Sequence, residues 1–198
     1  MPFESNLRIK CEDILGKDWV KDDPVTLYTY RCDGLTLYAA PPMAVVFPGT
    51  VDELASIVKL FNQHKISFIA RGAGTGLSGG AVPQQKSVII EMARFKEIHE
   101  VDWGNRTITV GPGVINLRIS EHVNSEGFHY APDPSSQKAC TIGGNLAENS
   151  GGPHTLKYGV TVNHVLGMEI VLPDGELVNL GGKHLGMPGP DLLGLMTG

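Results

Sequence analysis

The residues best suited to bind a ligand form one short segment, RGAGTGLSGG, at positions 71–80. Five of its ten residues are glycine. Glycine permits positive φ angles and carries no side chain, so successive backbone N–H groups can converge on an anion. Arg71, Thr75 and Ser78 add a cation and two hydroxyl donors. A pyrophosphate would satisfy all of these groups at once, whereas the alternative, a flexible turn, leaves the length of the segment and its donors unexplained.

The same segment raises the question of a nicotinamide-dinucleotide fold. Three of its glycines match the G-x-G-x-x-G pattern of that fold: Gly74, Gly76 and Gly79. Glu91 lies about where such folds keep the acid that binds a ribose. However, only residues 80–86 separate the glycines from the next expected strand, residues 87–92, and no helix of useful length fits there. We therefore expect a long anion-binding loop that returns to the sheet, with Glu91 as a structural or edge carboxylate.

A second glycine-rich segment spans residues 131–152 and is too long for a simple connection. Within it, Thr141 precedes Gly143-Gly144-Asn145, a turn expected to start a helix at Leu146 and to offer a second set of N–H donors. Neutral donors and glycines that allow close approach suit a large planar heterocycle better than a metal ion. His154, which follows two glycines beside this segment, is a further residue of interest.

The sequence does not indicate a metal site or a nucleophilic serine. Ser78 lies in L-S-G-G, which is not a G-x-S-x-G elbow. The cysteines Cys11, Cys32 and Cys140 are odd in number and lack C-x-x-C spacing, which favours a reducing cytoplasm over a disulfide framework. The histidines show no H-E-x-x-H motif and no close pair; they are His64, His99, His122, His129, His154, His164 and His184.

Composition excludes several classes of protein. A net charge of −5 argues against a nucleic-acid surface, because a phosphate backbone requires clustered Lys and Arg. Hydrophobic residues make up 41% of the 198 residues and charged residues 19%, as in ordinary globular proteins. The first ten residues lack the apolar region of a signal peptide, and no apolar run is long enough to span a bilayer. We expect a protein that neither binds nucleic acid nor spans a membrane.

The elements that must position the first segment form a β-α-β unit. Residues 44–47, AVVF, predict a buried strand that Pro48 and Gly49 end. Thr50 then opens a helix with a capping box to Glu53. Residues 66–70 predict a second strand, parallel to the first. This unit delivers the glycine segment at the C-terminal end of a strand, where ligands of open α/β sheets bind.

Further elements follow on both sides of this unit. Two strands joined at residues 103–105 are expected after the glycine segment, and Asn116 is expected to cap a helix through about Glu126, with Gly127 beyond its end. Residues 165–180 predict a β-hairpin that turns at residues 173–175. Residues 1–37 predict no more than a short helix and an extended arm.

Several motifs together resemble a known family. RGAGTGLSGG, APDPSS, CTIGGNLAENSGG and LKYG, in this order, are similar to the FAD-binding domain of the p-cresol methylhydroxylase and vanillyl-alcohol oxidase flavoproteins. YRCDGLTLY, MARFKEI and PDPSSQ most resemble the branch that contains the FAD-binding subunits of bacterial glycolate oxidases, close to D-lactate dehydrogenases. The resemblance runs from about residue 30 to residue 198 and is more specific for flavin binding than for substrate.

The resemblance implies an α+β fold of two small lobes with FAD between them, the PCMH-type FAD-binding domain. Residues 1–37 would be an N-terminal extension and residues 38–198 the domain, with the first lobe extending to about residue 110 and the second spanning residues 111–198. Because members of the family continue beyond the sequence DLLGLMTG, we expect the domain to be C-terminally incomplete, truncated before a substrate-binding cap.

The resemblance also implies which residues contact FAD. The first segment would face the pyrophosphate, the second would line the pyrophosphate and isoalloxazine, and the strand around Ile170 would reach the adenine end. Some relatives attach the flavin through a histidine in the first segment, and because Thr75 stands near that position we expect a non-covalent flavin. The implied contacts are Arg71, Gly72, Ala73, Gly74, Thr75, Gly76, Gly79, Pro132, Asp133, Ser136, Thr141, Ile142, Gly143, Gly144, Asn145, Gly151 and Ile170.

The activity that the resemblance implies is oxidation of a 2-hydroxy acid, most of all glycolate, by transfer of a hydride from the α-carbon to flavin N5. D-Lactate dehydrogenase or another FAD-linked 2-hydroxy-acid dehydrogenase is the alternative substrate assignment. Implied partners are an iron-sulfur subunit and a second flavin-domain subunit of a glycolate oxidase complex, in the cytoplasm or peripheral to the inner membrane. The residues that bind the hydroxy acid would lie beyond residue 198.

Two different classes of function remain open at this point. One is a nicotinamide-dependent dehydrogenase, which the lack of room for a helix after the glycines disfavours. The other is a non-catalytic subunit that uses the fold for contact within an oxidase assembly. A visible spectrum of the purified protein separates a flavoprotein from both.

Overall fold

A computed structural model describes residues 3–84, 86–183 and 189–198 of the chain. The described residues form two compact units. The first unit runs up to Arg94 and also includes Val171–Leu177, while the second contains Phe95–Ile170 and the chain from Val178 onward. The domain limits expected from the sequence stay a prediction.

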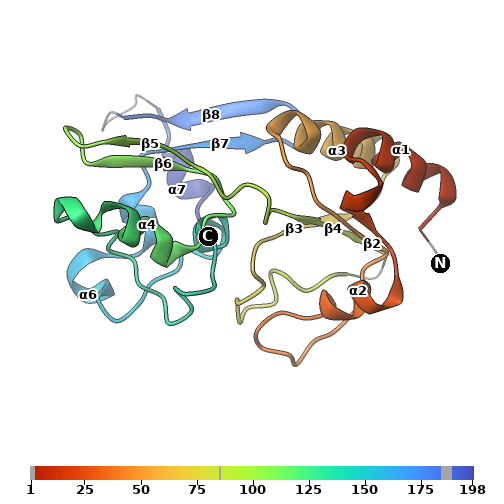
Figure 1. The fold of residues 1–198 in the computed structure, drawn as a ribbon, viewed down its shortest axis with the longest axis horizontal. Coiled ribbons are helices and arrows are strands. Elements are labelled where there is room, and N and C mark those ends of the chain that lie inside the picture. The colour runs from red at the N-terminus through yellow and green to blue at the C-terminus, as the bar shows by residue number, and fades with distance from the viewer. Residues whose placement is uncertain (1–2, 85, 184–188) are drawn as a thin grey trace. The chain divides into compact units, whose positions relative to one another are not determined.

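The first unit contains a four-stranded sheet of order β1-β2-β4-β3. β1 pairs antiparallel with β2. β4 pairs parallel with both β2 and β3, which Figure 1 labels. The strands are β1 (Val20–Lys21), β2 (Ala44–Val46), β3 (Phe68–Arg71) and β4 (Val88–Glu91). The buried strand expected at 44–47 and the parallel strand expected at 66–70 are confirmed, and β4 lies between them.

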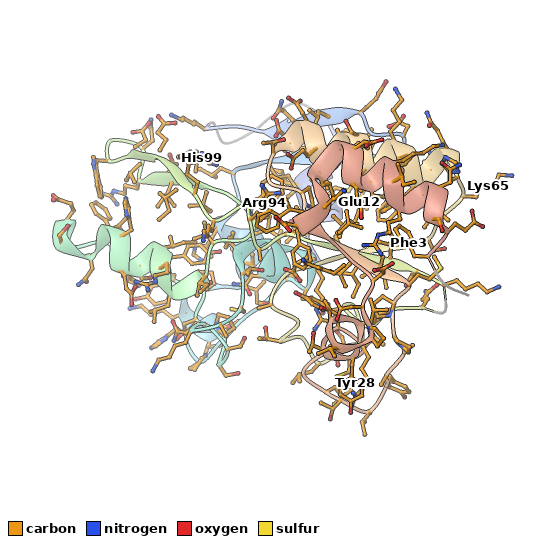
Figure 2. The ribbon with its side chains drawn as sticks, turned by 45° about the vertical axis from the view of Figure 1, so that its right-hand side comes forward. Phe3, Glu12, Tyr28, Lys65, Arg94 and His99 are labelled. Carbon is orange, nitrogen blue, oxygen red and sulfur yellow. The ribbon has the colours of Figure 1, made fainter. Side chains whose placement is uncertain are left out.

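Helices cover this sheet and supply the rest of its core. α1 and α3 lie side by side over it (Figure 1). Phe61 and Ile57 of α3 and Cys11 of α1 are fully buried against the strands. Tyr28 on α2 is exposed instead (Figure 2). The helices are α1 (Ser5–Leu15), α2 (Pro24–Thr29), α3 (Val51–Gln63) and the short 3-10 helix η1 (Lys17–Trp19).

The expected start of α3 is confirmed. The Thr50 hydroxyl accepts a hydrogen bond from the Glu53 N–H at 3.1 Å. The Glu53 carboxylate in turn accepts from the N–H of Gly49, at 2.6 Å, one residue before the position that a capping box uses. This pair of bonds satisfies donors at the helix start and fixes where β2 ends.

The second unit contains one two-stranded sheet, most of another and several short helices. The strand pair and the hairpin expected from the sequence are both confirmed, as β5–β6 and β7–β8 (Figure 1). The strands are β5 (Ile98–Asp102), β6 (Thr107–Val110), β7 (Gly167–Val171) and β8 (Leu177–Gly181). The helices are α4 (Asn116–Val123), η2 (Asn124–Glu126), α5 (Ile142–Ala147), α6 (Thr155–Tyr158), η3 (Thr161–His164) and α7 (Leu192–Leu195).

Asn116 does not cap α4, contrary to expectation. It is the first helical residue, and Ile115 occupies the N-cap position without a side-chain bond. Asn116 is instead 1% exposed, and its amide bonds to two other parts of the unit. The expected end is confirmed, because Gly127 follows η2 with a left-handed φ of 79°.

Candidate functional site

The glycine segment leaves β3 as an irregular loop without a helix among its described residues. Of its five glycines, Gly74 and Gly79 adopt positive φ, at 66° and 85°. Among the residues that the structure describes, no backbone N–H between Ala73 and Leu77 donates a hydrogen bond within the chain. Consecutive N–H groups without an acceptor are the feature that an anion-binding loop requires.

Arg71 was expected to add a cation to this loop, but the structure gives it a different task. The residue is 8% exposed, and its Nη1 donates to the carbonyls of Cys32 and Ala81, both at 2.9 Å, and of Tyr30 at 3.4 Å. A Cβ at Gly74 would overlap the same guanidinium. Arg71 therefore joins the two ends of the loop to an earlier segment, and a direct contact with a ligand stays a prediction.

Gly79 does not offer a free donor either. Its N–H donates to the Asp33 carboxylate at 2.9 Å, and a contact of Gly79 with a cofactor stays a prediction. Asp33 was not among the expected site residues, although it lies in the YRCDGLTLY motif that carries part of the resemblance. Its local signal is an Asp-Gly pair, Asp33-Gly34, which indicates a turn and not the partner of that turn.

Glu91 lies at the end of β4, between β2 and β3, so of the two expected alternatives, a structural or an edge carboxylate, the edge position is wrong. The backbone of Glu91 pairs in register with that of Arg71 in β3, and the residue is 4% exposed. Burial raises the pKa of the Glu91 carboxyl to about 7, although the nearby Arg71 guanidinium and two backbone N–H groups lower it. The protein thus buries a carboxyl group that titrates near neutral pH at the base of the glycine loop.

The second glycine-rich segment differs from expectation in its backbone. α5 begins at Ile142 and not at Leu146, and Thr141 is its N-cap. The expectation of free N–H donors here is wrong, because each of the first three is bonded within the chain. The bonds are Ile142 N–H to Val114 C=O at 2.8 Å, Gly143 N–H to Pro112 C=O at 2.9 Å and Gly144 N–H to the Thr141 hydroxyl at 3.4 Å.

The glycine at position 143 has a packing reason. A Cβ there would lie 2.7 Å from the Pro112 Cβ and 3.0 Å from the Pro112 oxygen. Asn145 is 2% exposed, and its side-chain amide donates to the side-chain Oδ1 of Asn116 at 2.7 Å. The Asn116 side-chain amide donates in turn to the Pro132 carbonyl at 3.0 Å. This buried chain of amides ties α5 and α4 to the PDPSS segment. Direct flavin contacts of residues 141–145 stay a prediction.

Asp133 and His154 meet in the second unit. His154 Nδ1 lies 2.5 Å from the Asp133 carboxylate, and the His154 N–H also bonds to it. Burial acts to raise the pKa of Asp133, but hydrogen bonds from the His154 ring and backbone hold this pKa below its ordinary value. The pair belongs to the wall of a cavity of about 260 Å³ lined by Ser120, His129, Tyr130, Ala131, Asp133, Gln137, His154 and Tyr158.

The other expected site residues of this unit have structural contacts of their own. The Ser136 carbonyl accepts from the N–H groups of Ala139 and Cys140, at 2.7 and 2.8 Å. Gly151 approaches the Thr155 side chain so closely that a Cβ would lie 2.7 Å from its hydroxyl oxygen. Ile170 lies in β7 and is half-buried. Whether these residues touch a flavin stays a prediction.

Among the described residues, no three His, Cys, Asp or Glu side chains gather as a metal site would require. No helix in the described part of the chain is both long and apolar enough to cross a membrane. His184 lies outside the described residues.

An open irregular loop of N–H groups without an acceptor follows a parallel strand of this α+β chain, and such a loop is typical of domains that bind a phosphate-containing cofactor without a Rossmann helix. Residues 42–181 match the FAD binding domain family. The chain belongs to this family, and its cofactor is FAD. The resemblance and the α+β fold expected from the sequence are confirmed.

Curated relatives point to one branch of oxidoreductases. The chain is 50% identical over 169 residues to glycolate oxidase subunit GlcD of Escherichia coli strain K12, which covers 85% of this chain and 34% of that protein. It is 39% identical over 186 residues to the GlcD subunit of Bacillus subtilis, covering 93% and 40%. D-Lactate dehydrogenase of Archaeoglobus fulgidus is 38% identical over 174 residues, covering 85% and 39%. The chain thus spans 34–40% of the length of these relatives.

Solved structures share the fold. Alkyldihydroxyacetonephosphate synthase superposes with a TM-score of 0.86 at 22% identity, over 100% of this chain and 38% of that one. p-Cresol methylhydroxylase superposes with a TM-score of 0.82 at 24% identity, over 97% and 40%. 4-Ethylphenol oxidase from Gulosibacter chungangensis gives 0.82 at 26% identity, over 98% and 39%.

The glycine loop fits the pyrophosphate of FAD in two respects. The N–H groups of residues 73–77 have no acceptor within the described chain, as a doubly charged ligand requires of its donors. The Arg71 guanidinium fills the space that a side chain at Gly74 would need. Only glycine at this position therefore leaves both the Arg71 hydrogen bonds and the loop in place.

Proposed function

We propose that this chain is the FAD-binding portion of a 2-hydroxy-acid oxidase or dehydrogenase, and that the full-length protein oxidises glycolate. The observation that carries the proposal is the 50% identity to a glycolate oxidase subunit over 169 residues. D-Lactate is the alternative substrate, favoured by the 38% identity to a D-lactate dehydrogenase. The lower identity of that relative makes it the second candidate.

In this proposal the residues of the chain bind and orient the cofactor. The free N–H groups of residues 73–77 bind the pyrophosphate, and Gly74 keeps the loop open for it. Pro132 and Asp133 are proposed to contact FAD along its pyrophosphate and isoalloxazine ring. Ile170 is proposed to lie near the adenine end. FAD supplies the redox chemistry when bound, by accepting a hydride equivalent from the α-carbon of the hydroxy acid.

The branch assignment also bears on partners. Two of the relatives are named as subunits of glycolate oxidase, so we infer that the full-length protein works in an assembly with further subunits. An iron-sulfur subunit and a second flavin-domain subunit are the partners that we propose. The same proposal places the protein in the cytoplasm, with any contact with the inner membrane made through those subunits.

FAD is proposed to be bound without a covalent link. Some family members carry a flavin-linked histidine in the glycine loop, and Thr75 stands near that position in this chain. Precipitating the full-length protein with acid should release yellow flavin into the supernatant, as measured by absorbance. Flavin that stays in the washed pellet would contradict the proposal.

The activity is tested with the full-length protein, because this chain covers only part of its relatives. Reduction of an artificial dye is measured with glycolate, D-lactate and L-lactate as substrates. We expect the highest kcat/KM with glycolate. Preference for D-lactate would support the alternative, and a yellow protein that reduces the dye with none of them would contradict a 2-hydroxy-acid oxidase.

A further inference from the structure

Residues 30–35, YRCDGL, precede the part of the chain that matches the FAD binding domain family, which begins at residue 42. This brace segment, as we name residues 30–35, nevertheless bonds to the glycine loop at several points. The contacts come from its backbone carbonyls, from the Asp33 carboxylate and from the Gly34 backbone. All of them lie within the first unit.

Asp33 uses both of its carboxylate oxygens in this contact. Oδ2 accepts from the Gly79 N–H at 2.9 Å, and Oδ1 accepts from the Leu35 N–H at 3.0 Å. The residue is 5% exposed. A buried carboxylate that accepts two backbone N–H groups fixes both backbone segments at once, because leaving either donor unpaired away from water is costly.

Gly34 brings the two backbones into direct contact. Its N–H donates to the Gly76 carbonyl at 3.0 Å. A Cβ at Gly34 would lie 2.8 Å from the Thr75 oxygen and 3.1 Å from the Gly76 oxygen, so no larger residue fits without moving the loop. From the other side, Arg71 donates to the carbonyls of Tyr30 and Cys32.

The hydrogen bonds from the brace segment use only some of the backbone groups of the glycine loop. They engage the Gly76 carbonyl and the Gly79 N–H, and they leave the N–H groups of residues 73–77 without an acceptor in the described chain. A glycine-rich loop loses much conformational entropy when it is ordered. A loop that is already ordered pays less of this cost when a ligand binds.

We propose that the brace segment, through Asp33 and Gly34, positions the glycine loop for the pyrophosphate of FAD. Asp33 is a positioning residue that never touches the cofactor. The proposal rests on the proposed role of the glycine loop as the pyrophosphate site. It extends the FAD site to a segment that lies before the family match.

The sign of the effect of Asp33→Asn separates positioning from simple electrostatics. Asparagine keeps the shape of the side chain but accepts with one oxygen only, so one of the two backbone N–H groups loses its partner. Removing a negative charge beside an anion site would by itself tighten FAD binding. Positioning predicts the opposite, a weakening of FAD affinity by about tenfold or more.

The experiment compares Asp33→Asn with Asp23→Asn in the full-length protein. Asp23 is the matched control, because its carboxylate accepts one N–H, that of Thr26 at 2.9 Å, as the cap of α2 and does not bond to the glycine loop. FAD affinity is measured by flavin fluorescence titration of the apoprotein. Hydrogen exchange of residues 72–79 is measured without FAD. We expect weaker binding and faster exchange in Asp33→Asn, and wild-type values for both in Asp23→Asn.

Wild-type or tighter FAD affinity in a folded Asp33→Asn variant would overturn the proposal, as would an equal loss in Asp23→Asn. If Asp33→Asn does not fold, Gly34→Ala tests the second contact, and unchanged affinity in this variant would overturn the proposal in the same way. Failure of the full-length protein to oxidise glycolate leaves these affinities unaffected, so the two proposals fail separately.

Discussion

Replacing Gly74 with valine is expected to weaken FAD binding by about a hundredfold or more. Gly74 has a φ of 66°, which a β-branched residue adopts only with strain. Its Cβ would also overlap the Arg71 guanidinium, which three carbonyl acceptors hold in place. The loop must therefore move, and with it the N–H groups of residues 73–77. Losing two charge-assisted bonds of roughly 1.5 kcal/mol or more each corresponds to about a hundredfold in affinity.

The measurement is isothermal titration of the apoprotein with FAD, in the full-length protein. Gly104→Val is a suitable control, because Gly104 lies in the β5–β6 turn and a Cβ there meets only the Asp102 carboxylate, at 3.6 Å. This control should bind FAD as the wild type does. Wild-type affinity in Gly74→Val would place the pyrophosphate away from this loop.

The second large effect concerns pH and the buried Glu91. Its pKa is about 7 in the folded chain against an ordinary value of 4.5, so the folded state binds the Glu91 proton more tightly than the unfolded state. The stabilisation is complete below pH 4.5 and is lost as pH rises through 7. A shift of this size corresponds to about 3 kcal/mol between these limits. The variant Glu91→Gln has no titrating group at this position, so its free energy of unfolding should not fall in this way. The difference between this free energy and that of the wild type should therefore increase from pH 4.5 to pH 8.

Urea unfolding of apoprotein at several pH values measures this difference. Glu126→Gln serves as the control, since Glu126 is an exposed residue of η2. Its stability should follow that of the wild type across the range. A constant difference between Glu91→Gln and wild type from pH 4.5 to pH 8 would show that Glu91 does not titrate in this interval.

The sequence predicts those elements whose cause is local. A few neighbouring residues are enough to predict the buried strand β2, from its apolar run, and the start of α3, from its Thr50 cap. The structure confirms both. The absence of space for a helix after Gly79 could also be read from the distance to β4. These local signals were enough to identify a loop rather than a Rossmann turn.

The site was harder to predict because its polar groups are paired over long distances. Arg71 looks like a ligand-binding cation until its acceptors at Tyr30 and Cys32 are known. Asn116 looks like a helix cap until Asn145, 29 residues later, is found against it. Glycine composition alone likewise could not show that the Gly143 N–H is already bonded to Pro112. The sequence shows which groups can donate a hydrogen bond, but only the fold shows which of these donors have no acceptor within the chain.

The strand order of the first sheet has a consequence for synthesis on the ribosome. β2 and β3 emerge first, but neither has a parallel neighbour until β4 arrives to lie between them. The same unit also takes in Val171–Leu177, and Val171 packs against its core. The first segments of this unit can therefore complete their packing only after much later segments have been synthesised. Pairing between segments that are far apart in the sequence is slow. During elongation the glycine loop, held between β3 and β4, is among the parts exposed to chaperones and proteases before the unit closes.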